Sequence, residues 1–148
     1  MILYRPMTEL DCEQVSYLYK ECFSQPWSLS AIKEMFTTDG YISLVAENDE
    51  KEIIGYVGMK TVFDEADITN VAVLPSMRKQ GIAKILLREL MEEAKKKGII
   101  SIFLEVRASN IPAITLYEHA DFKNCGRRKN YYHEPEEDAL LMVWNQEA

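Results

Sequence analysis

The fold is decided by one stretch in the middle of the chain, which reads Val71-Ala72-Val73-Leu74-Pro75-Ser76-Met77-Arg78-Lys79-Gln80-Gly81-Ile82-Ala83-Lys84. It begins with an apolar strand that Pro75 ends, and a loop with cations and one glycine then leads directly into a helix. The first turn of a helix leaves backbone N–H groups unpaired, and the helix dipole makes that end partly positive. Such an end binds phosphate, and Gly81 and Ala83 carry little or no side chain where a diphosphate would approach.

Three cations of this stretch, Arg78, Lys79 and Lys84, stand out in a chain whose formal net charge is -7. Neither GxxxxGK[ST] nor GxGxxG is present, which argues against binding of nucleoside triphosphates and dinucleotides. On these residues alone two interpretations remain open: a phosphate site, or a solvated basic turn that precedes a helix.

Strands and helices alternate on both sides of this stretch. Hydrophobic periodicity predicts strands at residues 2–5, 41–47, 52–61, 67–74, 99–106, 122–132 and 138–144, and helices at 9–23, 29–37, 83–97 and 111–120. Thr8 and Asp11 predict a capping box, and Gly98 is expected to end the third helix. The run at 99–106 is nearly all apolar, which predicts a central strand buried on both faces. The order predicts a single α/β domain over residues 1–148, with a mixed sheet of about seven strands and about four helices.

Composition argues against several classes of protein. The 148 residues are 47% hydrophobic and 28% charged, which is ordinary for a globular domain and too apolar for a disordered chain. The acidic balance argues against binding of duplex DNA, and no run approaches the ~20 apolar residues of a membrane-spanning helix. The three cysteines lack CxxC spacing and no HExxH motif is present, so we expect neither a disulfide framework nor a metal site. With no signal peptide recognisable at the N-terminus, we expect a reduced, cytoplasmic protein.

The loop resembles the signature of a known family. Arg78-Lys79-Gln80-Gly81-Ile82-Ala83 is similar to the R/Q-x-x-G-x-G/A pattern of the GNAT family of acetyl-CoA-dependent N-acetyltransferases. A second group of matches resembles one branch of that family, the bacterial ribosomal-protein-alanine N-acetyltransferases (RimI type). These matches are LEVRASN at 104–110, LYE at 116–118, NYY at 130–132, Pro26-Trp27-Ser28, Asp64-Glu65-Ala66 and Glu137-Asp138-Ala139. One departure is Asp121, where many members of the family have glycine.

The resemblance implies that acetyl-CoA is the cosubstrate and that no metal takes part. In this family the pyrophosphate of coenzyme A lies on backbone amides of the loop, and the acetyl-pantetheine arm pairs with the preceding strand, where two parallel strands splay apart. The residues so implied are Val71, Ala72, Val73, Arg78, Lys79, Gln80, Gly81, Ile82, Ala83, Lys84 and Asn110. Asparagine is also a preferred helix N-cap, and Asn110 can serve both purposes.

Acetyl transfer to an amine needs a base, a donor for the developing oxyanion and a proton donor for the leaving thiolate. The backbone N–H of Val73 is the candidate oxyanion donor. Glu105, in LEVR, is the candidate base, and its alternative is a salt bridge, for which Arg107 and Lys60 are the expected partners.

Tyr117, in LYE, is the candidate catalytic acid, and its alternative is an ordinary core tyrosine. Tyr131 and Tyr132 either line the acceptor groove or are ordinary strand aromatics. Both interpretations of each tyrosine remain open on the sequence.

The resemblance implies direct acetyl transfer from acetyl-CoA to the α-amino group of a protein N-terminus, by analogy the N-terminal alanine of a small-subunit ribosomal protein. The alternatives are a GNAT enzyme for another amine (a polyamine, an aminoglycoside or other protein N-termini) and a non-catalytic acyl-CoA-binding regulator. Acidic turn residues that flank the acceptor side in this family would attract a basic N-terminus: Asp64, Glu65, Asp67, Glu134, Glu136, Glu137 and Asp138. With no coiled coil or interface stripe, we expect a monomer that binds neither membrane nor nucleic acid directly.

Overall fold

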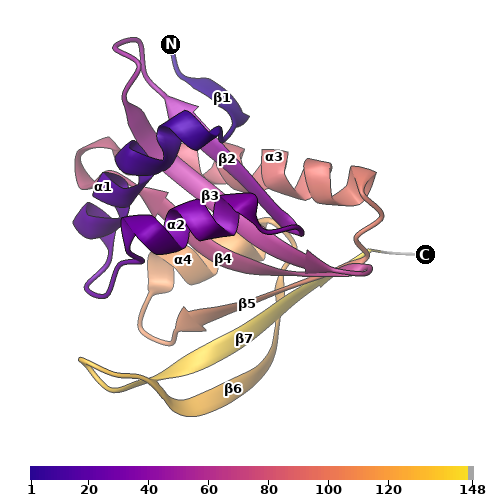
Figure 1. Ribbon diagram of the computed structural model, residues 1–148. Helices are drawn as coiled ribbons and strands as arrows, with labels where there is room; N and C mark the ends of the chain where they lie inside the picture. Colours follow the sequence, from indigo (N-terminus) through magenta and orange to yellow (C-terminus); the bar gives the residue numbers. More distant parts are fainter. Residues whose placement is uncertain (147–148) are drawn as a thin grey trace.

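The computed structural model describes residues 1–146, which form a seven-stranded mixed sheet with helices on both faces (Figure 1). The strands are β1 (Leu3–Pro6), β2 (Tyr41–Glu47), β3 (Ile53–Val62), β4 (Glu65–Val73), β5 (Ser101–Arg107), β6 (Lys123–Tyr132) and β7 (Glu137–Asn145). The helices are α1 (Cys12–Cys22), α2 (Leu29–Thr37), α3 (Ile82–Lys96) and α4 (Ile111–His119), with 3-10 turns η1 (Glu9–Asp11) and η2 (Pro75–Met77). The predicted mixed α/β sheet with seven strands and four helices is therefore confirmed.

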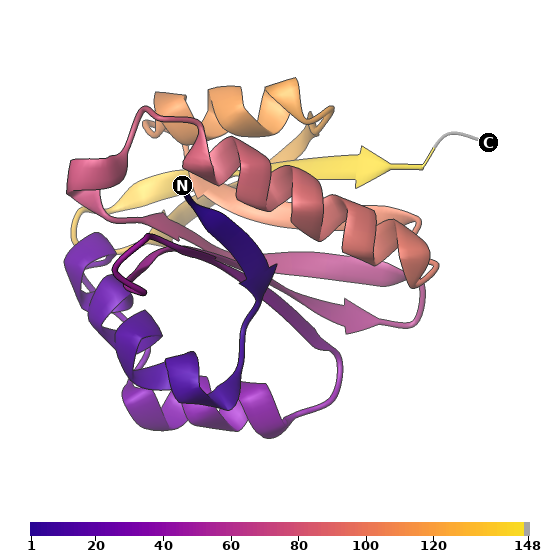
Figure 2. The same cartoon turned by 90° about the horizontal axis from the view of Figure 1, so that it is seen from above.

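The strand order across the sheet is β1-β2-β3-β4-β5-β7-β6. Every neighbouring pair is antiparallel except β4 and β5, which are parallel. Figure 2 shows α1 and α2 on one face of the sheet and α3 and α4 on the other. Successive side chains of β2 and β3 therefore enter two different cores, because strand residues alternate between the faces.

Local signals explain where the helices begin and end. Thr8 and Asp11 form the predicted capping box, with the Thr8 N–H donating to Asp11 Oδ2 at 2.7 Å, but the first turn is 3-10 and the α-helix starts only at Cys12. Gly98, with φ +81°, follows the end of α3 as predicted. Asp121 adopts left-handed backbone with φ +70° just after α4, where glycine would fit most easily.

The prediction that β5 is buried on both faces is wrong. Ile102, Leu104 and Val106 are buried in the core beneath α3 and α4, whereas Glu105 on the other face is exposed. The core beneath α1 and α2 takes its strand residues from β2, β3 and β4 alone, so these helices stop short of β5. One face of the sheet is therefore left open over β5, β7 and β6.

Candidate active site

β4 and β5 separate soon after they meet. They pair over only three residues each: Glu65 with Ser101, Ala66 with Ile102 and Asp67 with Phe103. Beyond these pairs β4 continues alongside β3 alone and β5 alongside β7 alone, so the two parallel strands diverge (Figure 1). The backbone edge of β4 that faces β5 is therefore left without a partner strand.

The register of β3 and β4 decides which residues use this edge. The N–H of Leu74 donates to the carbonyl of Ile54 at 2.9 Å, which makes Gly55 and Val73 a non-hydrogen-bonded pair. The N–H and C=O of Val73, and by alternation those of Val71, consequently point away from β3 and toward the space between the strands. The backbone groups of Ala72 face β3 instead. Of the three strand residues implied for the coenzyme, two offer their backbone polar groups to this space.

The carbonyl of Val73 is held by two donors. Arg78 Nε donates to it at 3.0 Å, and the thiol of Cys22 donates to it at 3.3 Å. The N–H of the same residue remains free to meet a carbonyl oxygen that enters between the strands. Burial raises the pKa of the Cys22 thiol, so this cysteine stays protonated and acts as a donor.

The loop before α3 presents a row of unpaired amides. Lys79 and Gly81 adopt left-handed backbone, with φ +65° and +80°. Within residues 1–146, no acceptor receives a hydrogen bond from the backbone N–H groups of residues 79–84. A Cβ added at Gly81 would meet no atom within 4 Å, so the space beside this residue is open. Free amides at a helix N-terminus, beside the exposed cations Lys79 and Lys84, suit a diphosphate.

Glu105 stands on the open face of β5, with its side chain 32% exposed. Its Oε1 lies 3.8 Å from Nε of Arg128 on β6, a loose and exposed ion pair. The salt bridges expected with Arg107 and Lys60 are not formed: Arg107 pairs with Glu137, and Lys60 lies over an aromatic ring. The carboxylate is therefore accessible at the side of the sheet that α1 and α2 leave uncovered.

Asp67, one of the acids that the resemblance places on the acceptor side, is a neighbour of Glu105. It occupies the last paired position of β4, opposite Phe103, which lies two residues before Glu105 on the same face of β5. Loss of solvent raises the pKa of Asp67, and the negative charge of Glu105 raises it further. Strand alternation was the signal in the sequence, but only the register of β4 and β5 shows that Asp67 and Glu105 lie close together.

Tyr117 on α4 fits both of its interpretations. It is only 7% exposed, and its ring packs edge-on against Phe122 with ring centroids 5.8 Å apart. Its hydroxyl makes no hydrogen bond within residues 1–146, and burial raises its pKa well above the usual range. The ring therefore belongs to the core, while the protonated hydroxyl is free to donate. Asn110 caps α4 as predicted, its Oδ1 accepting from the N–H of Ala113 at 3.2 Å.

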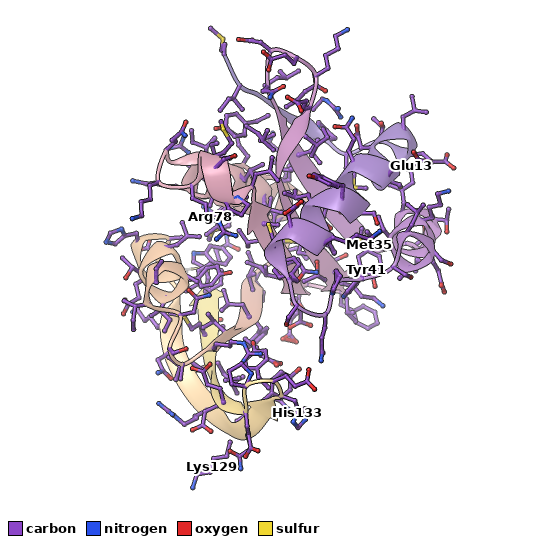
Figure 3. The ribbon with its side chains drawn as sticks, turned by 90° about the vertical axis from the view of Figure 1, so that its left-hand side faces the viewer. Glu13, Met35, Tyr41, Arg78, Lys129 and His133 are labelled. Atoms are coloured by element: carbon purple, nitrogen blue, oxygen red, sulfur yellow. The ribbon has the colours of Figure 1, made fainter. Side chains whose placement is uncertain are left out.

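The β6–β7 hairpin faces the same region. Figure 3 looks onto this end of the molecule, with Arg78 above and His133 and Lys129 on the hairpin below. Tyr131 and Tyr132 pack edge to face, with centroids 5.1 Å apart. Burial and the nearby charge of Glu105 raise the pKa of Tyr132 to about 12, and Tyr132 in turn adds to the raised pKa of Tyr117. Tyr132 therefore lies near both the candidate base and the candidate acid.

The remaining candidate groups carry no site of their own. Cys12, Cys22 and Cys125 are free cysteines. Across the part of the chain that the structure describes, no three metal-ligating side chains gather. No helix in that part is long and apolar enough to cross a membrane.

Comparison with known proteins identifies the family. Residues 12–122 match the acetyltransferase (GNAT) family. The chain is 37% identical over 137 residues to the [ribosomal protein bS18]-alanine N-acetyltransferase of Haemophilus influenzae, covering 90% of this chain and 91% of that protein. The crystal structure of the ribosomal-protein-S18-alanine N-acetyltransferase from Escherichia coli superposes with a TM-score of 0.91 at 30% identity, covering 100% of this chain and 96% of that one.

A more distant structure shares the fold. NAA60 of Arabidopsis thaliana, solved in complex with acetyl-CoA, superposes with a TM-score of 0.86 at 22% identity, covering 98% of each chain. At that identity the likeness concerns the fold alone. The family match over most of the chain, together with the close relatives that span nearly its whole length, shows that this chain belongs to the acetyltransferase (GNAT) family.

Proposed function

We propose that this chain, acting as a single domain, transfers the acetyl group of acetyl-CoA to the α-amino group of the N-terminal alanine of ribosomal protein bS18. One observation carries the chemistry: the separation of β4 from β5 leaves the Val73 N–H facing the gap, with Glu105 on the open face beside it. The acceptor follows from the named activity of relatives that align over about nine-tenths of both chains.

The residues of the loop and of β4 fit acetyl-CoA. The free amides of residues 79–84, with Lys79 and Lys84, would hold the pyrophosphate, and the backbone groups of Val71 and Val73 would pair with the pantetheine arm. Asn110 uses its Oδ1 to cap α4, and the remaining hydrogen-bonding capacity of its side-chain amide would contact the coenzyme. When bound, the coenzyme supplies an activated acetyl thioester.

Each step of the transfer has a group to serve it. A free α-amino group has a pKa of about 8, so a modest base suffices, and Glu105 takes the proton directly or through one water. The N–H of Val73 stabilises the negative charge that builds on the carbonyl oxygen as nitrogen attacks carbon. As the carbon–sulfur bond breaks, the hydroxyl of Tyr117 gives its proton to the leaving thiolate. The amine gains the acetyl group, and no covalent intermediate on the protein is required.

The compartment and the oligomeric state belong to the same proposal. The three free cysteines support action in a reducing compartment, the cytoplasm. We take the chain to act as a monomer, because Glu105, Tyr117 and the loop before α3 all come from one copy.

The decisive experiment measures thiol release from acetyl-CoA with a panel of amines. The panel holds peptides that begin with alanine followed by basic residues, the same peptides with a blocked N-terminus, and spermidine. The proposal expects transfer to the free alanine terminus and none to the blocked peptides. Preference for spermidine would identify an enzyme for another amine, and tight coenzyme binding without transfer to any amine would identify a regulator.

A further inference from the structure

Arg107, the last residue of β5, makes more contacts with the β6–β7 hairpin than any role assigned so far requires. Its Nη1 donates to the carbonyl of Pro135 at 2.9 Å, and its Nη2 donates to the carbonyl of His133 at 3.3 Å. Its guanidinium pairs with Glu137 at 3.4 Å and lies 4.4 Å from the ring centroid of Tyr132. One side chain thus reaches both sides of the hairpin tip.

Glu137 makes a second link between the hairpin tip and the end of β5, and we call the contacts of Arg107 and Glu137 together the clasp. Its second carboxylate oxygen accepts a hydrogen bond from the backbone N–H of Ser109, in the turn that follows β5. Contacts with Ser109 and Arg107 hold the pKa of Glu137 below its usual range, so the carboxylate is charged at neutral pH. The hairpin tip and the end of β5 are therefore joined at two points, one through each of these side chains.

Asp138 also shapes this hairpin, through contacts with two residues of β6. Asp138 accepts from the N–H of Asn130 at 3.0 Å and pairs with Arg127 at 2.8 Å, across an irregularity in the pairing of β6 and β7. Asn130 has left-handed backbone, with φ +53°. Bulges of this kind re-aim the side chains that follow them, here Tyr131 and Tyr132.

The hairpin meets the candidate base through Arg128 of β6, whose Nε lies 3.8 Å from Glu105 Oε1 and whose guanidinium lies 5.7 Å from the ring centroid of Tyr131. Contact with the Glu105 carboxylate raises the pKa of Tyr131, and the same charge acts on Tyr132. Because β5 is open on this face, the tyrosine pair lies beside the open side of the sheet that carries Glu105. The position of the pair depends on the hairpin, and Arg107 holds the hairpin tip.

We propose that Arg107 is a positioning residue, which holds the β6–β7 hairpin as a fixed wall of the acceptor side and thereby sets the affinity for the acceptor N-terminus. This inference rests on the proposed function, because it takes Glu105 as the base toward which the acceptor must be led. Arg107 touches neither reacting group; it acts through Tyr132 and the hairpin tip.

The chemistry of the side chain makes the proposal specific. The planar guanidinium donates in two directions at once and stacks on an aromatic ring, which an ammonium on a flexible stem cannot reproduce. Arg107→Lys keeps the charge opposite Glu137 but loses the paired donation to Pro135 and His133. Arg107→Gln loses the charge as well. The two variants should therefore form a graded series.

The test measures KM for an alanine-terminated basic peptide, KM for acetyl-CoA and kcat, in the wild-type chain, Arg107→Lys and Arg107→Gln. We expect peptide KM to rise roughly tenfold or more in Arg107→Gln and by less in Arg107→Lys, with acetyl-CoA KM nearly unchanged. The coenzyme loop lies before α3, away from the hairpin. The KM for the peptide should therefore rise while the KM for acetyl-CoA stays nearly unchanged. Arg88→Gln, which removes an exposed cation from α3, is the matched control and should change neither KM.

A purely stabilising role gives a different result. Partial unfolding lowers the concentration of active enzyme and hence kcat, but it leaves both KM values where they were. Unchanged peptide KM in Arg107→Gln, or equal rises in both KM values, would overturn the proposal.

Hydrogen exchange at residues 131–136 separates this inference from the proposed function. The inference expects faster exchange there in Arg107→Gln than in the wild-type chain, whichever amine is acetylated. If the wild-type chain acetylated no N-terminal peptide, the proposed function would fail. Unchanged exchange in Arg107→Gln would then still overturn the clasp.

Discussion

Tyr117 combines a packed ring with a free hydroxyl, so removal of the oxygen alone separates its two roles. We expect Tyr117→Phe to keep its melting temperature, because the edge contact with Phe122 survives, while kcat falls about 100-fold through loss of the proton donor. Burial raises the pKa of Tyr117, so the acid stays protonated and the wild-type kcat should show no descending limb from this residue up to about pH 10. Steady-state kinetics and thermal melts test this. Near-normal turnover in Tyr117→Phe would leave only a core tyrosine.

Glu105 is exposed and loosely paired, so its replacement should affect chemistry and leave the fold intact. We expect Glu105→Gln to lower kcat/KM for the peptide by roughly 100-fold at pH 7. The defect should shrink above pH 8, where the acceptor amine is already neutral and needs no base. A pH profile of both proteins measures this. A defect of constant size from pH 6 to pH 10 would mean that Glu105 binds the acceptor but does not take its proton.

The sequence singled out candidate residues for the site, but it did not predict their partners. LEVR pointed to Glu105, but its neighbour proved to be Arg128, because Arg107 is taken up by the hairpin. The choice between them depends on the irregular pairing of β6 with β7, which no local pattern encodes. The same holds for Ala72: whether a strand residue offers its backbone to a ligand depends on the phase of the ladder with β3.

At the scale of elements, α3 offers a matched pair of glycines, one at each end. Gly81 and Gly98 have nearly equal φ, +80° and +81°, and a Cβ at either would meet no atom within 4 Å. Gly81→Ala and Gly98→Ala should therefore lose similar stability, about 1 kcal/mol each from left-handed backbone. Only Gly81 borders the free amides, so we expect the Kd for acetyl-CoA to rise about tenfold in Gly81→Ala alone. Titration calorimetry and thermal melts decide this, and equal coenzyme affinities would remove Gly81 from the phosphate site.

The types and order of the elements were predictable because each element carries its own periodicity. Which strands the helices cover was not predictable. The apolar run before Glu105 is equally consistent with a strand buried on both faces and with one that is open on one face. That α1 and α2 end over β4 is a property of how two helices pack on a twisted sheet. The proposed acceptor side lies on the face that this incomplete coverage leaves open, so its location could be proposed only from the tertiary structure.

Across the whole molecule, which carries a net charge of -7, some acidic side chains are neutralised by ion pairs and others are not. Glu137 and Asp138, two of the acids expected to attract a basic acceptor, are each paired with an arginine, at 3.4 and 2.8 Å. Their field is largely cancelled at a distance. Glu134 and Glu136 at the hairpin tip are exposed and form no ion pair within residues 1–146. On the hairpin, steering of a cationic N-terminus should therefore depend on these two.

We expect the double variant Glu134→Gln/Glu136→Gln to raise KM for a basic peptide several-fold at low ionic strength, because an attractive field near the entrance is lost. Salt shortens the Debye length from ~10 Å at 0.1 M to ~3 Å at 1 M, so the wild-type and variant KM values should converge as salt is added. Glu50→Gln/Glu89→Gln removes the same charge from the β2–β3 turn and the outer surface of α3, and should leave peptide KM unchanged at every salt concentration. Parallel KM curves for all three proteins would mean that the acidity serves solubility and does not guide the acceptor.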